Sequence, residues 1–194
     1  ISPRPSIPNT PVTNSRMETW MRILGDGART LLYSSGLSLD WWTFAYQYYC
    51  LAHSLLKINP RSGKPRYQFR FPNAKPVTLH PFGCRVTYVP HRIGNTIKNG
   101  EPMAQERGLE GILLGYFVPP GEPCSGKVAV VAPLSNFTKS VFTYKVITTG
   151  DFRFHGIDYP LRKLRFEQQL VKYRSVNPDI SEDEYRTMIW GPLD

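Results

Sequence analysis

The chain has 194 residues, 41% of them hydrophobic, and a formal net charge of +9 at pH 7. This length and apolar content suit one medium-sized domain or two small ones with a real core. No apolar run reaches the roughly 18 residues that cross a bilayer, and no signal segment opens the chain, so we expect no membrane partner. The three cysteines are far apart in sequence, which favours free thiols in a reducing compartment.

The positive charge is concentrated in the middle of the chain. Residues 57–107 carry ten Lys or Arg against two acids, whereas residues 175–194 carry one against five. A basic region of this kind attracts a polyanion, and nucleic acid is the usual one. A solvated basic surface is the alternative.

Residues 1–13 hold four prolines and predict an extended arm. Residues 14–59 predict two helices. In the first, apolar residues recur at spacings of three and four, and Gly36 ends the pattern. They are Met17, Met21, Leu24, Ala28, Leu31 and Leu32. Gly25 and Gly27 are expected to weaken this helix by up to ~1 kcal/mol each. A second helix, expected from Ser38, carries a broad aromatic stripe.

Residues 60–80 are basic and rich in proline, and we expect them to connect two units. Residues 81–152 contain short runs of β-branched and aromatic residues separated by turn residues, which predict a small antiparallel barrel. Its expected interior residues alternate along the strands. They are Phe82, Cys84, Val86, Ile112, Leu114, Val128, Val130 and Val141. Residues 153–194 are expected to form a tail with a helix near 163–173 and a second one that begins at the capping box of residues 181–184.

Several motifs occur together in a recognisable order. The opening stretch contains Thr10-Pro11, Asn14, Glu18, Arg22, Leu24 and Ala28-Arg29-Thr30. The later segments include SGLSLDWWTFA, PRYQFRF, HPFGCRVTYVP, EGILLGY and SVFTYKVITTGDF. In this order and spacing they resemble the integrase region of Ty1/copia-type retrotransposon Pol polyproteins, over roughly residues 6–152. The resemblance implies an α+β chain, in which the C-terminal helices of an RNase H-like integrase core precede a small antiparallel SH3-like β-barrel.

The resemblance gives Glu18 a specific role. Glu18 falls on the glutamate of the family's Asp, Asp, Glu triad, which holds two Mg²⁺ or Mn²⁺ ions for phosphoryl transfer. Both aspartates would come from a missing N-terminal part of the integrase, together with a zinc-binding module. We therefore expect catalysis only in a full-length parent and none from this chain alone. The alternative for Glu18 is an ordinary helix-start acid paired with Arg22 at i,i+4.

The chain departs from the family pattern just after Glu18. Thr19, Trp20 and Met21 stand where the family has Arg-Lys-Asn, residues that contact DNA, and only Arg22 keeps the basic character. Further contacts to the phosphate backbone are expected from the run KINPRSGKPRYQFRF, which interleaves cations with aromatic residues; a solvated linker is the alternative. The expected DNA-binding residues are Arg22, Lys57, Arg61, Lys64, Arg66 and Arg70.

The function expected from the resemblance is DNA integration and nucleic-acid binding as part of a copia-type polyprotein. DNA is the expected partner, self-association stays open, and the family implies the nucleus, with the cytoplasm as the alternative compartment. The second hypothesis belongs to a different class: a stand-alone or domesticated module that binds nucleic acid or protein.

Overall fold

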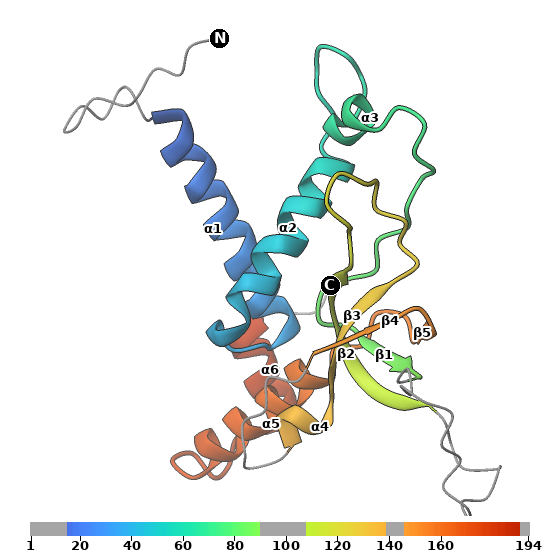
Figure 1. Cartoon of the computed structure of the whole chain (residues 1–194). Coiled ribbons are helices and arrows are strands. Elements are labelled where there is room, and N and C mark those ends of the chain that lie inside the picture. Colours follow the sequence, from blue (N-terminus) through green and yellow to red (C-terminus); the bar gives the residue numbers. More distant parts are fainter. Residues whose placement is uncertain (1–14, 90–107, 139–145, 191–194) are drawn as a thin grey trace, which may run out of the picture.

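A computed structural model describes residues 15–89, 108–138 and 146–190 of the chain. Val141, one of the expected interior residues, lies outside these ranges, as does the arm of residues 1–13. The fold is α+β: N-terminal helices pack beside a five-stranded antiparallel sheet (Figure 1). None of the helices in the described ranges combines the length and the apolarity that crossing a membrane requires.

The two N-terminal helices form an antiparallel hairpin, as the apolar periodicity predicted. Helix α1 covers Ser15–Ser35, and α2 covers Trp42–Leu56 after the 3-10 turn η2 at Leu39–Trp41. Gly36 ends α1 with a φ of 77°, a left-handed conformation that glycine adopts without strain. Toward the start of α1 the two helices splay apart (Figure 1). Met17 and Met21 in that half of α1 are 60% and 55% exposed, so only the second half of the expected apolar face is buried.

A short helix, α3 at Arg66–Arg70, lies within the segment expected to be a connector. The strands are β1 (Arg85–Tyr88), β2 (Leu109–Tyr116), β3 (Ala129–Pro133), β4 (Ile147–Thr149) and β5 (Phe152–Phe154). A further short helix, α4 at Ser135–Thr138, follows β3. All strand pairs are antiparallel, in the order β4-β3-β2-β1-β5.

The sheet is open, so the expectation of a closed barrel is wrong. The predicted single strand near residue 152 is divided at Gly150 and Asp151 into β4 and β5, which pair with opposite edges of the sheet. The amide of Val89 donates to the carbonyl of Asp151 (2.9 Å), and the hydroxyl of Thr149 donates to the carbonyl of Val89 (3.1 Å). The sheet therefore curls until its edges meet at one corner, without a ladder between β4 and β5.

The expected interior residues are correct for β1 and β2 and wrong for β3. Phe82, Cys84, Val86, Ile112 and Leu114 are at most 2% exposed. Val128 and Val130 are only half-buried, and Ala129 and Val131 are buried in their place. The pairing register of β2 and β3 shifts between Leu113 and Gly115, so Val130 faces Gly115, which has no side chain to cover it.

One hydrophobic core joins the helices to the sheet. It contains Leu32 of α1, Ala45 of α2, Val86 of β1 and Leu113 of β2, together with Leu161 of the later helix α5. Strand β2 is buried from Gly111 to Tyr116, on both of its faces. Two tyrosines bind the segment before β1: the Tyr48 hydroxyl donates to the carbonyl of His80 (2.6 Å), and the amide of His80 donates to the hydroxyl of Tyr116 (2.9 Å).

The expected C-terminal helices are both present. Helix α5 covers Pro160–Arg174 and α6 covers Glu182–Trp190. The capping box is confirmed: the amide of Ser181 donates to Glu184 Oε2 (2.9 Å), and the amide of Glu184 donates to Ser181 Oγ (3.2 Å). The hydrogen bond from the Ser181 backbone, followed by that from its side chain, lowers the pKa of the Glu184 carboxyl.

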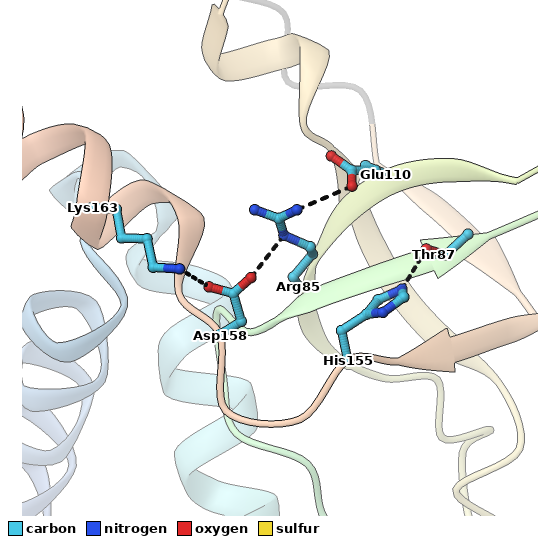
Figure 2. A network of polar contacts seen from close by, with 6 residues as sticks. All are labelled: Arg85, Thr87, Glu110, His155, Asp158 and Lys163. Atoms are coloured by element: carbon cyan, nitrogen blue, oxygen red, sulfur yellow. Dashed lines mark hydrogen bonds and ion pairs between the residues drawn. The ribbon is translucent and has the colours of Figure 1, made fainter.

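A polar network attaches α5 to the sheet (Figure 2). Asp158 forms ion pairs with Arg85 Nε (2.9 Å) and with Lys163 Nζ (2.7 Å), and Arg85 also pairs with Glu110 (3.1 Å). In the same network Thr87 Oγ1 lies 2.6 Å from His155 Nε2. The hydrogen bond from Lys163, helped by the charge of Arg85, lowers the pKa of the Asp158 carboxyl although burial opposes this. Asp158 thus links β1 to α5 as an anion.

Candidate nucleic-acid interface

The segment of residues 57–70, here called the basic loop, contains five Lys or Arg and no Asp or Glu. Asn59 organises its turn. The amide of Asn59 donates to the carbonyl of Lys64 (3.0 Å), the amide of Gly63 donates to the carbonyl of Asn59 (2.9 Å), and the amide of Arg61 donates to Asn59 Oδ1 (3.0 Å). These bonds define the backbone of the turn, and the side chains of Arg61 and Lys64 are exposed on it.

Helix α3 forms the end of the basic loop and is fixed to the sheet side of the molecule by Tyr67. The amide of Cys124 donates to the Tyr67 hydroxyl (2.5 Å), and that hydroxyl lies 3.5 Å from the carbonyl of Cys124. The Tyr67 and Phe71 rings pack together with centroids 5.1 Å apart. Burial raises the pKa of the Tyr67 hydroxyl, which therefore stays protonated as a donor. Arg66 and Arg70 remain exposed.

Trp20 of α1 lies where the two N-terminal helices splay apart. The guanidinium carbon of Arg66 is 4.9 Å from the centre of its ring, and Lys57 Nζ is 6.0 Å away. Both distances are within the range of a cation–π attraction. Trp20 therefore brings together two of the expected DNA-binding cations, one from the end of α2 and one from α3.

His53 contributes to the same cluster. Its ring stands nearly perpendicular to that of Trp20, at 87° with centroids 5.3 Å apart, and its Nε2 is buried without a hydrogen-bond partner among the described residues. Burial, followed by the charges of Lys57 and Arg66, lowers the pKa of the His53 imidazole. The ring is therefore neutral at neutral pH, because the neighbouring cations oppose a further positive charge. Cys50, one turn before His53, is exposed.

Among the described residues, the cations of the basic loop have no carboxylate partners. In the ranges that the structure describes, no ion pair involves Lys57, Arg61, Lys64, Arg66 or Arg70. Arg70 instead lies over the ring of Phe71, 5.3 Å from its centre. Exposed cations without acidic neighbours create a positive potential that an anionic backbone can neutralise.

The other two expected site residues lie on α1, two residues before and two residues after Trp20. Glu18 and Arg22 are exposed on the first turns of α1, and within the described residues no ion pair joins them. Among all the residues that the structure describes, no three His, Cys, Asp or Glu side chains come together as a metal site. Mg²⁺ takes several oxygen ligands, so the one carboxylate of Glu18 does not fit a Mg²⁺ or Mn²⁺ site by itself.

Sequence reasoning did not identify Trp20 and His53 as members of the site. Trp20 shares the apolar stripe of α1 with Met17 and Leu24, and this spacing was a usable signal for its direction. The contacts with Lys57 and Arg66 depend on how α1 crosses α2 and on α3, and no local pattern contains that information.

Comparison of the chain with protein-family models, with curated proteins and with solved structures finds no match.

Proposed function

We propose that the chain binds nucleic acid through the phosphate backbone, with the basic loop as the main contact. The observation that carries this proposal is the set of five exposed cations in residues 57–70, without any acid among them, on a turn and a helix held by hydrogen bonds. Contacts of this kind release counterions and ignore base sequence. The expected binding is therefore weak, indifferent to sequence and sensitive to salt.

The biological setting that we propose is the integrase region of a copia-type retrotransposon. The ordered motifs from Thr10-Pro11 to the segment ending at Phe152 support this setting. In it, α1 and α2 are the last helices of an RNase H-like core, and Glu18 supplies one of three catalytic carboxylates. The basic loop supplies contacts to DNA. Catalysis requires the carboxylates of a full-length parent.

The binding proposal is tested by removing three charges in two different places. The site variant replaces Lys64, Arg66 and Arg70 by Ala. The control variant replaces Arg153, Arg165 and Lys172 by Ala, three exposed cations of β5 and α5 that lose the same total charge. Fluorescence anisotropy with labelled duplexes of two unrelated sequences, at low salt, compares the affinities.

We expect the site variant to bind both duplexes much more weakly than the control variant does, and by the same factor. Equal losses in the two variants would mean that only net charge matters and that the basic loop is a solvated linker. The integrase setting has a separate test in the reading frame of the source gene. Two in-frame aspartates and a His/Cys module upstream of Ile1 support it, whereas a start codon without them favours the stand-alone module.

A further inference from the structure

Helix α3 presents two faces of different character. Tyr67 and Phe71, four residues apart, pack together, and the Tyr67 hydroxyl accepts a hydrogen bond from the amide of Cys124. Arg66, Phe69 and Arg70, at spacings of three and four, are all exposed, and Arg70 also lies over the Phe71 ring at 5.3 Å. Phe69 is 59% exposed and lies between the two cations. A phenylalanine in this position contributes little to the core.

The exposed side of α3 continues onto α1. Arg66 contacts the ring of Trp20 at 4.9 Å, and Lys57 lies 6.0 Å from the same ring. Arg66 therefore links the exposed side of α3 to Trp20. The stacking face is defined here as Trp20, Lys57, Arg66, Phe69 and Arg70. Arg66 already covers part of the half-buried Trp20, so Phe69 is the more open of the two rings.

Phosphate binding alone does not require these rings. A duplex keeps its bases stacked inside and presents its phosphates, which the exposed cations of the basic loop can reach. A single strand presents a phosphate and an unstacked base in every nucleotide. Aromatic side chains close to cations suit this repeat, because every base has a face that stacks on a ring.

We propose that the stacking face binds the unpaired nucleotides of a single strand, with bases stacked on Phe69 and Trp20 and phosphates held by Lys57, Arg66 and Arg70. This inference rests on the proposed function, because the basic loop supplies the cations for both. It adds a preference for single-stranded over double-stranded nucleic acid. Single-stranded DNA and RNA share the required chemistry.

The experiment measures fluorescence anisotropy with four labelled probes of equal length: oligo-dT, oligo-U, an abasic DNA strand and a DNA duplex. The key variant is Phe69→Ala, because Phe69 is exposed and we expect its replacement to leave the fold intact. Phe69→Trp keeps a stacking ring. Trp20→Ala is the second site variant, and Trp42→Ala, which removes a 54% exposed ring at the start of α2, is the matched control.

We expect Phe69→Ala and Trp20→Ala each to weaken binding of oligo-dT or oligo-U roughly fivefold or more, the scale of one lost stacking contact. Binding of the abasic strand and of the duplex should stay within about twofold, and Phe69→Trp should bind like the unchanged chain. Tighter binding of oligo-U than of oligo-dT, or the reverse, supports the proposal and assigns the natural strand.

Two outcomes overturn the inference. If neither Phe69→Ala nor Trp20→Ala weakens single-strand binding beyond the Trp42→Ala control, the rings do not stack on bases. If the abasic strand binds as tightly as oligo-dT, the bases contribute nothing. Duplex binding that persists in either case leaves the proposed backbone contact standing, whereas failure of all four probes to bind removes both proposals.

Discussion

At the scale of single residues, the structure explains why glycine occurs at position 27 in the middle of a helix. Glycine weakens a helix, and the sequence alone counts Gly25 and Gly27 as costs. In the structure a Cβ on Gly27 would lie 2.2 Å from Tyr49 Cε2, whereas one on Gly25 would meet only the Tyr46 hydroxyl at 3.2 Å. Gly27 therefore lets the Tyr49 ring of α2 pack directly against the backbone of α1.

We predict that Gly27→Ala destabilises the chain by about 1–2 kcal/mol, because displacing the Tyr49 ring outweighs the gain in helix propensity. Gly25→Ala is the matched control and should be close to neutral. Urea unfolding followed by circular dichroism gives both free energies. A Gly27→Ala chain more stable than the original by about 1 kcal/mol would mean that helix propensity alone decides this position.

Asp158 gives a second prediction at this scale, with a definite dependence on pH. Its pKa is lowered in the folded chain, so its ionised form stabilises the fold fully above its ordinary pKa of about 3.9, and this contribution is lost as the pH falls through the lowered value. We predict that Asp158→Asn costs about 1 kcal/mol at pH 7 and that the difference from the unchanged chain shrinks below about pH 4.

Urea midpoints of the Asp158→Asn chain across pH measure this difference. Glu182→Gln breaks the exposed pair between Glu182 and Arg186 and serves as the control, with an expected cost of only about 0.3–0.5 kcal/mol. A cost of Asp158→Asn that stays constant from pH 7 to pH 3 would contradict the proposed role of the charged network in Figure 2.

At the scale of elements, the sequence predicted the helices better than the sheet. The periodicity from Met17 to Leu32 and the capping box at Ser181 are local signals, and both identified their helices. The face of β3 depended on a register shift beside Gly115, which is a property of two strands together. The sequence did not predict α3, because five residues are too few for a periodic signal. Pro65, which directly precedes α3, is a residue type that often stands at the start of a helix.

The candidate site shows the same division. The sequence identified the cations of the basic loop, since a run of like charges is a local property. It did not identify Trp20 as their neighbour, because the contact with Arg66 crosses from α1 to α3. The prediction of a closed barrel was wrong for a related reason. The turn at Gly150 and Asp151 divides one chain segment between the two edges of the sheet.

Tyr67 provides the test at the scale of elements. We predict that Tyr67→Phe lowers the free energy of unfolding by about 0.5–1.5 kcal/mol, because the amide of Cys124 loses its acceptor. Tyr33→Phe, which alters a 67% exposed tyrosine of α1, should change nothing. Urea unfolding compares the two. Equal stability of the Tyr67→Phe chain and the unchanged chain would show that Tyr67 does not hold α3 in place.

At the scale of the whole molecule, the helices and the sheet share one core, with Leu32, Ala45 and Val86 in a single cluster. We predict that the chain unfolds in one transition, with coincident midpoints by far-ultraviolet circular dichroism and tryptophan fluorescence. Trp41, the largest fully buried side chain among the described residues, belongs to this core and packs against Phe44 of α2 and Phe137 of α4. Two separate midpoints would show that residues 14–59 and 81–152 fold as independent domains.

The architecture determines where the charged segments lie in the molecule. The basic loop and α3 lie at one end of the molecule, and α5 and α6 lie at the other (Figure 1). The acidic first turn of α6, with Glu182, Asp183 and Glu184, is therefore remote from the basic loop. The fold thus keeps the acidic first turn of α6 away from the basic loop, although α5 at the same end carries cations of its own.

The central claim is that the basic loop binds a phosphate backbone, and the salt dependence of duplex binding tests it most directly. Each phosphate contact contributes about 0.9 to the slope of log affinity against log salt concentration. We predict a steep decline for the unchanged chain and a slope smaller by roughly 2–3 when Lys64, Arg66 and Arg70 are replaced by Ala. An unchanged slope in this triple variant, or no binding at low salt, would contradict the claim.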